Sequence, residues 1–322
     1  MSILNGQRVI AIEEHFMDPQ VGAHFKGADA KAGGPLLERL EDLGEGRIKS
    51  MDEAGIDMQV LSQTAPSLQR VAADVAAEVA RGANDRLHAV CKNHPDRFAA
   101  FGALPTADPK AAADELERTV DKLGFCGAMI HGLTNSTEFI DDEKFWPIFE
   151  RAAALNVPIY MHPARPHQAV LDAYLKDYAD RWPGFVVAAW GYTMETATAG
   201  IRMVMSGVFD KHPNLKIILG HMGETLPFLK WRIDFGLNRP GNEPIEFDKI
   251  FSEHFYITTS GFFSDPAMLC CIQEMGVDRI LFAVDYPYVP NKPGPEWMER
   301  LMLNDEDKAK ILHGNSERLL GV

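Results

Sequence analysis

The sequence predicts an α/β fold, a (β/α)8 barrel of the TIM type with long βα loops at its C-terminal face. Eight short apolar runs recur along the 322 residues, each followed by a stretch with helical periodicity. Most of the runs are almost continuously apolar, which is typical of parallel strands that are buried on both faces. Because strand and helix alternate eight times, a closed barrel is favoured over a doubly wound sheet.

The elements follow one another in regular order. The predicted strands are residues 9–12, 58–61, 98–103, 126–130, 158–161, 216–219, 255–258 and 280–283. The predicted helices are residues 36–54, 71–92, 109–123, 142–155, 194–209, 265–275 and 305–320. In the first helix, apolar side chains from Leu36 to Met51 share one stripe, and an Asp near the start of two later helices favours the helix dipole.

Two connections are longer than an ordinary βα loop. They span residues 163–193 and 223–253, and the second combines a predicted helix with a Pro/Gly-rich stretch at 238–244. Barrels build their active sites from long loops of this kind. Since the sequence shows no repeat, low-complexity tract or linker, we expect a single domain over residues 1–322.

The composition limits the classes of partner. With 32 basic and 46 acidic side chains, the formal net charge is −14, which argues against a nucleic-acid binder. No apolar run approaches the roughly 18 residues that span a bilayer, and no signal peptide is recognised at the N-terminus. The four cysteines, which form no CxxC pair, are expected to be free thiols in the cytoplasm.

Candidate metal ligands and acid–base groups follow four of the predicted strands. In chain order they are Glu13 and His15, His162, His221 with Glu224 three residues on, and Asp285. The carboxyl ends of barrel strands meet at one face, so we expect these side chains to converge there. An extended backbone directs Glu13 and His15 to the same side. His131, after the fourth strand, is expected in the same mouth, where it would contact substrate.

Each of these residues taken alone is more typical of a structural polar group than of a functional one. Four strand ends in register favour a functional site instead, and a mixture of carboxylate and imidazole suits one divalent ion, Zn²⁺ or Mn²⁺. The remaining histidines are interpreted as structural or surface groups. The sequence contains no phosphate-binding loop, no dinucleotide fingerprint and no nucleophile elbow.

The motifs resemble those of the amidohydrolase superfamily, in its branch of metal-dependent decarboxylases of the γ-resorcylate (2,6-dihydroxybenzoate) and 5-carboxyvanillate types. The resemblance is nearly full-length, and its most specific parts are IAIEEHF at 10–16, GHMGE at 220–224 and DYPY at 285–288. Within this branch, His15 implies coordination of the resorcylate type. Residues 131–135 and 165–182 match neither type closely, so the ring substitution of the substrate is left open.

The resemblance implies a role for each matching residue. Glu13, His15, His162 and Asp285 match the metal ligands, and His221 with Glu224 matches an acid–base pair. Arg47 and Arg232 match arginines that hold the substrate carboxylate or support its pocket. In relatives such an arginine can come from a neighbouring subunit, so the resemblance implies a homodimer or homotetramer.

The expected function is therefore that of a carboxy-lyase in the catabolism of aromatic compounds. It would decarboxylate a hydroxy- or dihydroxybenzoate without oxidation, with Asp285 protonating the ring carbon before CO₂ leaves. The same ligands would also serve a hydrolase of an amide, lactone or enol ester that uses a metal-bound water. A third alternative is an inactive barrel that acts as a binding protein.

Overall fold

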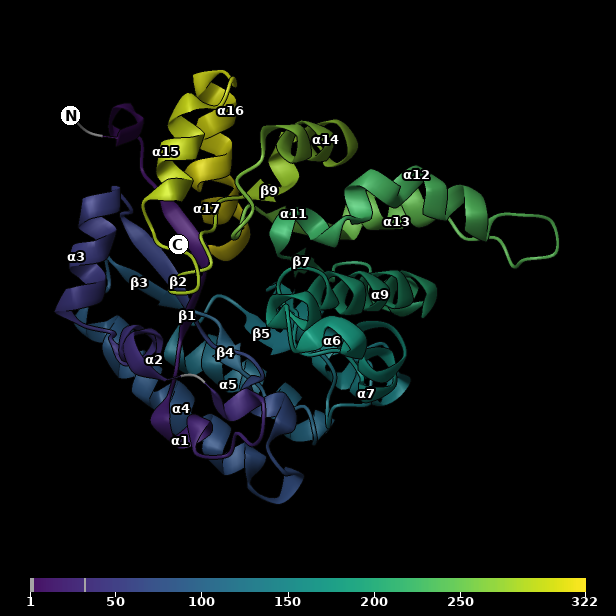
Figure 1. The fold of residues 1–322 in the computed structure, drawn as a ribbon, viewed down its shortest axis with the longest axis horizontal. Coiled ribbons are helices and arrows are strands. Elements are labelled where there is room, and N and C mark those ends of the chain that lie inside the picture. Colours follow the sequence, from purple (N-terminus) through teal and green to yellow (C-terminus); the bar gives the residue numbers. More distant parts are fainter. Residues whose placement is uncertain (1–2, 32) are drawn as a thin grey trace.

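Parallel strands surrounded by helices form the body of the molecule in the computed structural model, which describes residues 3–31 and 33–322 (Figure 1). One parallel sheet contains β1 (Ile10–Phe16), β2 (Met58–Gln63) and β3 (Phe98–Ala100). The other contains β4 (Gly102–Ala103), β5 (Ala128–His131), β6 (Ile159–His162), β7 (Ile217–Leu219), β8 (Phe255–Thr258) and β9 (Ile280–Leu281). Because only Phe101 separates β3 from β4, the two together correspond to the predicted strand at 98–103.

Backbone hydrogen bonds connect the two sheets at both junctions. At the first, Phe101 N donates to Leu61 O over 2.9 Å. At the second, β1 meets the segment after β9, where Asp285 N donates to Glu13 O over 3.0 Å and Glu14 forms a parallel bridge with Tyr286. The eight strand positions thus follow the (β/α)8 barrel plan that the alternation of elements predicted.

Burial on both faces explains why the strands are apolar throughout. Every residue of β1, β2 and β5 to β8 is buried. One set of side chains, including Ile12, Met129 and Ile218, packs together as a cluster of its own, and the alternate set packs in the larger core beside the helices.

Four of the predicted helices appear with bounds shifted by at most four residues. They are α4 (Ala73–Asn93), α5 (Pro109–Leu123), α6 (Trp146–Leu155) and α14 (Asp265–Met275). Two more predicted helices are each divided in two. They are α2 (Gly34–Glu41) with α3 (Glu45–Ala54), and α9 (Gly191–Met205) with α10 (Val208–Lys211). The helix predicted at 305–320 is divided into α16 (Asp305–Ala309), a π-helical turn η8 (Lys310–Gly314) and α17 (Asn315–Leu320).

The breaks in the divided helices have local causes. Asp42 leaves helical geometry and its Oδ1 accepts from Gly44 N over 2.8 Å, so the side chain competes with the helix for backbone partners. Gly207, with φ of +82°, turns the chain between α9 and α10 in a left-handed conformation that other residues disfavour. The prediction of single continuous helices was therefore wrong at 36–54 and 194–209.

Shorter elements fill the connections. The helices are α1 (Pro19–Gly22) and α15 (Pro293–Arg300), and the 3₁₀ turns are η1 (Ile3–Gly6), η2 (Asp29–Lys31), η3 (Ser67–Arg70), η4 (Glu143–Phe145) and η7 (Val277–Arg279). The four cysteines are free, as predicted. Across the described residues, helices long and apolar enough to cross a membrane are absent.

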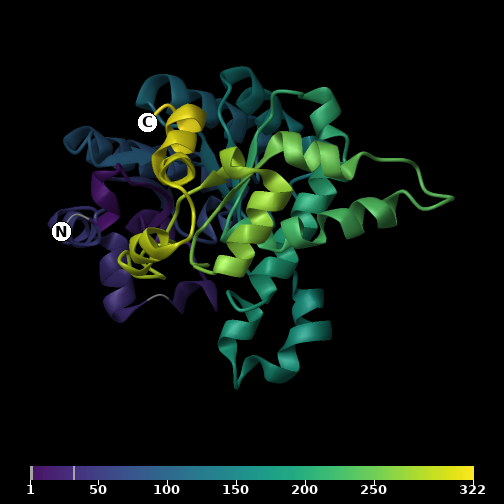
Figure 2. The same cartoon turned by 90° about the horizontal axis from the view of Figure 1, so that it is seen from above.

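The two long connections project from the barrel. Residues 163–193 contain α7 (Gln168–Val170), the π-helical turn η5 (Leu171–Leu175), α8 (Lys176–Ala179) and η6 (Pro183–Val186). The second connection contains α12 (Leu226–Leu237) and α13 (Phe247–His254), which extend outward side by side and are joined by a loop (Figures 1 and 2). We call residues 226–254 the arm.

Candidate metal and catalytic site

Strand β1 places Glu13 and His15 on one side of the backbone, as their spacing predicted. Both side chains are fully buried, and Glu13 Oε1 lies 3.9 Å from His15 Nε2. The register between β1 and β2 shifts between Ala11 and Glu14, so the strand carries an irregularity beside the site. Irregularities of this kind commonly re-aim side chains next to active sites.

The other predicted strand-end residues converge on the same point. Glu13 Oε1 lies 3.2 Å from His162 Nε2 and 3.4 Å from His221 Nε2. Asp285 Oδ1 lies 3.2 Å from His15 Nε2, and its Oδ2 lies 3.8 Å from His221 Nε2. The ends of β1 and β6, the turn after β7 and the segment after β9 therefore each contribute to one cluster.

The cluster fits a divalent cation. Glu13 Oε1, His15 Nε2 and Asp285 Oδ1 are buried yet form no hydrogen bond among the described residues, although they face one another. One ligand atom each from Glu13, His162, His221 and Asp285 lies within 4.8 Å of the others. Carboxylate oxygens and imidazole nitrogens are suitable donors for Zn²⁺ and Mn²⁺, and a cation would offset the buried charge.

The structure brings both His15 and His221 to this cluster, whereas the sequence placed only His15 among the ligands. Their other ring nitrogens differ in partner. His15 Nδ1 lies 3.2 Å from Ser62 Oγ, and His221 Nδ1 lies 2.7 Å from Glu224 Oε1. His162 Nδ1 lies 2.7 Å from Pro163 O, which can only accept, so Nδ1 carries the proton and Nε2 presents a lone pair to the cluster.

The segment from His221 to Thr225 contains α11 (His221–Glu224) and is left-handed throughout. Its φ values are 49°, 56°, 72°, 53° and 67° in order, and four of the five residues are not glycine. Left-handed backbone costs roughly 1–2 kcal/mol for each such residue, and strain of this kind tends to gather at functional sites. The turn directs the Glu224 carboxylate back onto His221, and Thr193 Oγ1 donates to Glu224 Oε2 over 2.8 Å.

Charge interactions in this cluster oppose the effect of burial. Burial disfavours the charged form of His221, but Glu13 and Glu224 outweigh it and hold the pKa of His221 well above its usual range. Burial likewise opposes the charge on Asp285, but His15 and His221 keep the pKa of that carboxyl below its usual range. These interactions therefore favour the charged forms of both side chains.

Glu14 holds the backbone on both sides of Asp285. Its Oε1 accepts from Val284 N over 2.9 Å and its Oε2 accepts from Tyr286 N over 3.2 Å. Asp285 itself is left-handed, with φ of +73°. Because Glu14 is fully buried, its pKa is raised to about 8, so the side chain that clamps this bend is largely protonated below that pH.

The predicted arginines lie away from the cluster. Arg47 is fully buried, donates from Nη2 to His15 O, and places its guanidinium 4.8 Å from the ring centre of Tyr286. Burial lowers the pKa of Arg47 to about 10. Arg232 is exposed on α12. Arg47 thus contacts the backbone of β1, whereas Arg232 lies at the surface, and the roles that the resemblance implied for them stay predictions.

His131 is buried beside His162 of the cluster. Its Nδ1 lies 3.0 Å from His162 Nδ1, and its pKa is lowered well below the usual value because the ring is buried beside two other imidazoles. Like Glu13, His15 and His162, His131 is not among the side chains that line the cavity described below, and its contact with substrate stays a prediction. The histidines that we interpreted as surface groups are half-buried, and none joins the cluster: they are His24, His88, His167, His254 and His313.

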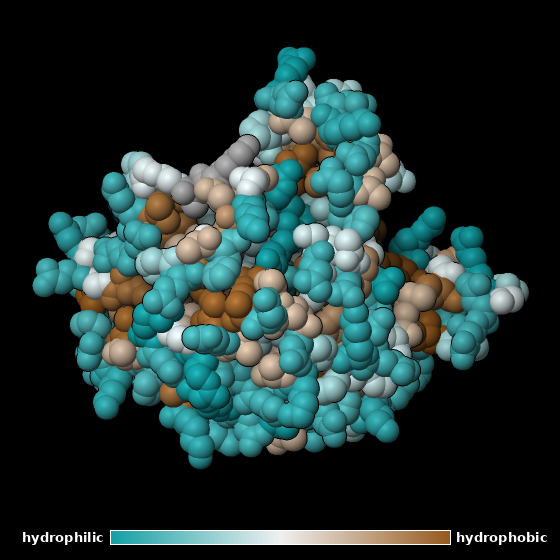
Figure 3. Space-filling model, turned by 90° about the horizontal axis from the view of Figure 1, so that it is seen from below, coloured by the Kyte–Doolittle hydropathy of each residue, from teal (hydrophilic) through white to brown (hydrophobic). Residues whose placement is uncertain are grey.

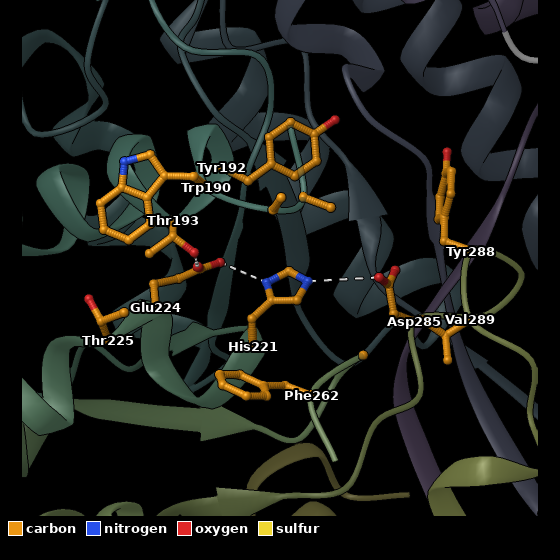
Figure 4. A pocket seen from close by; sticks show the side chains of 13 residues that line it. Trp190, Tyr192, Thr193, His221, Glu224, Thr225, Phe262, Asp285, Tyr288 and Val289 are labelled. Atoms are coloured by element: carbon orange, nitrogen blue, oxygen red, sulfur yellow. Dashed lines mark hydrogen bonds and ion pairs between the residues drawn. The ribbon is translucent and has the colours of Figure 1, made fainter. Parts of the chain in front are cut away.

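A cavity of about 470 Å³ opens onto the cluster (Figure 4). His221 lies between Glu224 and Asp285 in the lining, and the aromatic walls come from Trp190, Tyr192, Phe262 and Tyr288. Among the described residues, neither Lys nor Arg lines this cavity. Sequence reasoning missed these aromatic walls, together with Thr193 and Ser62, because nothing in their local sequence marks them.

The structure is a (β/α)8 barrel in which carboxylates and imidazoles gather at the carboxyl ends of the strands. This arrangement is typical of metal-dependent hydrolases and lyases. Comparison with known families narrows this class. The family model described as amidohydrolase matches residues 14–322, and the chain belongs to that family.

Individual relatives are similar over nearly the whole chain. A γ-resorcylate decarboxylase of Polaromonas sp. is 39% identical, with 98% of each chain covered. The solved structure of a dihydroxybenzoic acid decarboxylase from Polaromonas sp., with bound manganese and the inhibitor 2-nitroresorcinol, is 37% identical with a TM-score of 0.87, covering 98% of this chain and 97% of that one. A 5-carboxyvanillate decarboxylase from Novosphingobium aromaticivorans, complexed with manganese and 4-hydroxy-3-methoxy-5-nitrobenzoic acid, has a TM-score of 0.90 at 31% identity and the same coverage.

Proposed function

We propose that this protein is a metal-dependent carboxy-lyase that removes CO₂ from a hydroxy- or dihydroxybenzoate without oxidation. The observation that carries the proposal is the set of orphaned buried atoms of Glu13, His15 and Asp285, which face one another beside an aromatic-walled cavity. Relatives that share this fold are decarboxylases of γ-resorcylate and 5-carboxyvanillate. An aromatic acid therefore suits both the walls and the polar end of the cavity.

Glu13, His15, His162 and Asp285 would hold one divalent ion, either Mn²⁺ or Zn²⁺. Manganese is favoured by its presence in both related structures. When bound, the ion supplies positive charge for the carboxylate and for a neighbouring phenolic oxygen of the substrate. His162, locked by its contact with Pro163 O, keeps its Nε2 directed at the cluster without rearrangement.

Asp285 delivers the proton in this proposal. Its Oδ1 faces His15, while its Oδ2 faces His221 at 3.8 Å, so one oxygen serves the cluster and the other exchanges a proton. The proton passes to the ring carbon that bears the carboxylate. The bond to the carboxyl carbon then breaks, its electron pair restores the aromatic ring, and CO₂ leaves. The imidazolium of His221 supplies Asp285 with this proton, and Glu224, hydrogen-bonded to His221 Nδ1, stabilises the imidazolium.

We propose that the protein works as a homodimer or homotetramer. The cavity lacks a lining cation among the described residues, and Arg232 lies exposed on the projecting arm, where it would reach a neighbouring copy. A carboxylate suits such an arginine, because a guanidinium binds it in a bidentate manner.

The family match over residues 14–322 supports one domain, and the four free cysteines fit a cytoplasmic location.

Release of CO₂ from a panel of ortho-hydroxybenzoates by the Mn²⁺-loaded protein tests the proposal. Asp285→Asn keeps the shape of the side chain but removes its acidity, so kcat is expected to fall at least about 100-fold. Asp278→Asn, at an exposed carboxylate, serves as the matched control. An active Asp285→Asn variant would contradict the role of Asp285. Hydrolysis of an ester or lactone with no CO₂ from any acid would favour the hydrolase instead.

A further inference from the structure

Three buried hydroxyl groups form a continuous chain beneath the metal cluster. Tyr160 OH donates to Glu13 Oε2 and lies 2.9 Å from Thr258 Oγ1. Thr258 Oγ1 lies 2.8 Å from Ser260 Oγ, which accepts from His221 N over 2.9 Å. Tyr160, Thr258, Ser260 and Glu13 are all fully buried. This row of hydrogen-bonded hydroxyls, which we call the hydroxyl chain, therefore connects β6 and the end of β8 with two residues of the cluster, Glu13 and His221.

The two ends of the chain determine the direction of every hydrogen bond in it. A backbone N–H only donates and an ionised carboxylate only accepts, whereas each hydroxyl has one proton to give. His221 N–H therefore donates to Ser260, Ser260 donates to Thr258, and Tyr160 donates to Glu13. The one proton of Thr258 is shared between Tyr160 OH at 2.9 Å and Glu13 Oε2 at 3.3 Å, so every bond still points toward Glu13. Bonds aligned in one direction polarise one another, so the last donor to Glu13 is strengthened.

Gly220 leaves the space through which this chain passes. A Cβ atom at residue 220 would lie 2.7 Å from Glu13 Oε2 and 3.2 Å from both Ser260 Oγ and Tyr160 OH. Contacts of that length would displace the carboxylate or the hydroxyls. Space for the hydroxyl chain therefore explains why residue 220 is a glycine. Its backbone conformation does not require one, since its φ of −71° is open to other residues.

We propose that Tyr160, Thr258 and Ser260 are positioning residues that couple the orientation of Glu13 to the backbone of His221. The hydroxyl chain occupies Oε2 of Glu13 and so leaves Oε1, which forms no hydrogen bond among the described residues, as the oxygen that would hold the cation. At its other end it holds His221 N–H at the start of the left-handed turn. This inference rests on the proposed metal site, but not on the identity of the substrate.

The middle of the chain offers the sharpest test. Thr258→Val removes the hydroxyl and keeps the shape, whereas Thr258→Ser keeps the hydroxyl and loses a methyl group. We expect Thr258→Val to weaken Mn²⁺ binding by about 10–100-fold, and Thr258→Ser to stay within about threefold of wild type. Electron paramagnetic resonance of free Mn²⁺ measures the affinity, and the melting temperature of the metal-free protein reports any general loss of stability.

The two ends of the chain should respond differently. Tyr160→Phe is expected to weaken Mn²⁺ binding as Thr258→Val does, while Tyr256→Phe, on β8 under Arg279, is the matched control and leaves it unchanged. In Ser260→Ala, Thr258 still reaches Glu13 Oε2 at 3.3 Å, so metal affinity stays within about threefold. His221 loses its anchor in that variant, and kcat is expected to fall at least about tenfold with KM little changed.

Several results would overturn the inference. Equal Mn²⁺ affinity in Thr258→Val and Thr258→Ser would remove the role of the hydroxyl, and equal loss in Tyr160→Phe and Tyr256→Phe would indicate packing alone. A wild-type protein that binds no divalent ion would contradict it as well. Since CO₂ release is measured separately, a protein that binds Mn²⁺ through this chain but decarboxylates no acid would contradict only the proposed function.

Discussion

Glu195 on α9 is buried without a partner for one of its oxygens. Oε1 forms no hydrogen bond among the described residues, and the side chain shares a small pocket with His162. Burial raises the pKa of Glu195 to about 8 from 4.5. The folded protein therefore binds a proton that the unfolded chain releases above pH 4.5, and stability falls as the pH rises through 8.

Glu195→Gln should remove this loss of stability at high pH, because an amide stays neutral at every pH. In metal-free protein we expect wild type and variant to melt alike near pH 4.5, and the variant to melt at least about 3 °C higher at pH 8.5. Thermal unfolding followed by circular dichroism at both pH values measures the difference. Glu150→Gln, at an exposed position on α6, is the control; an equal gain there would show that burial is not the cause.

Residues at the ends of strands were predictable from the sequence, whereas their supports were not. Glu13, His15, His162, His221 and Asp285 each follow an apolar run, and barrel geometry alone brings such positions together. Ser260 and Thr193 contact the site through side chains whose neighbours come from distant segments. The contact of Arg47 with His15 O likewise depends on how α3 packs, which periodicity does not specify.

Among the elements, the left-handed turn at residues 221–225 departs most from what local sequence predicts. Strand lengths and most helices follow from hydrophobic periodicity, but a run of non-glycine residues with positive φ is unfavourable on its own. Packing against Ile257 and Pro227, together with the bond from His221 N to Ser260, holds the turn in this conformation. Gly223 is the one residue of this run that tolerates a positive φ without cost.

Gly223→Ala is expected to destabilise the protein by about 2 kcal/mol or more, because φ is +72° and the new Cβ would lie 2.8 Å from Ile257 Cγ2. Gly236→Ala, inside α12 and in open space, should instead stabilise it by about 0.5–1 kcal/mol. Urea unfolding of both variants measures the free energies. A Gly223→Ala variant as stable as wild type would show that the turn relaxes without cost.

At the scale of the whole molecule, the arm exposes more aromatic surface than a free surface usually carries. Phe228, Trp231 and Phe235 on α12 are 79%, 68% and 49% exposed. The rings of Trp231 and Phe235 stack with centres 5.2 Å apart, and hydrophobic surface is visible on the arm at the right of Figure 3. Exposed patches of this kind mark sites of association, which supports the proposed oligomer.

Trp231→Glu should therefore shift the protein toward a smaller species, because it places a charge in the middle of the patch. Light scattering coupled to size-exclusion chromatography measures the mass. Met302→Glu, at a methionine that is 94% exposed outside the arm, is the control and should not change the mass. A wild-type protein that is already a monomer would contradict the proposed assembly.

The clamp of Glu14 on the backbone around Asp285 also has a consequence for biosynthesis. Residues 13 to 15 leave the ribosome first, but the strand and the bend that complete the cluster arrive only when residue 285 of 322 has been made. Of the four proposed ligands, Glu13 and His15 are made at the start of translation, His162 near its middle, and Asp285 only towards its end. The backbone hydrogen bonds that join β1 to the segment after β9 therefore cannot form until the last part of the chain has been synthesised.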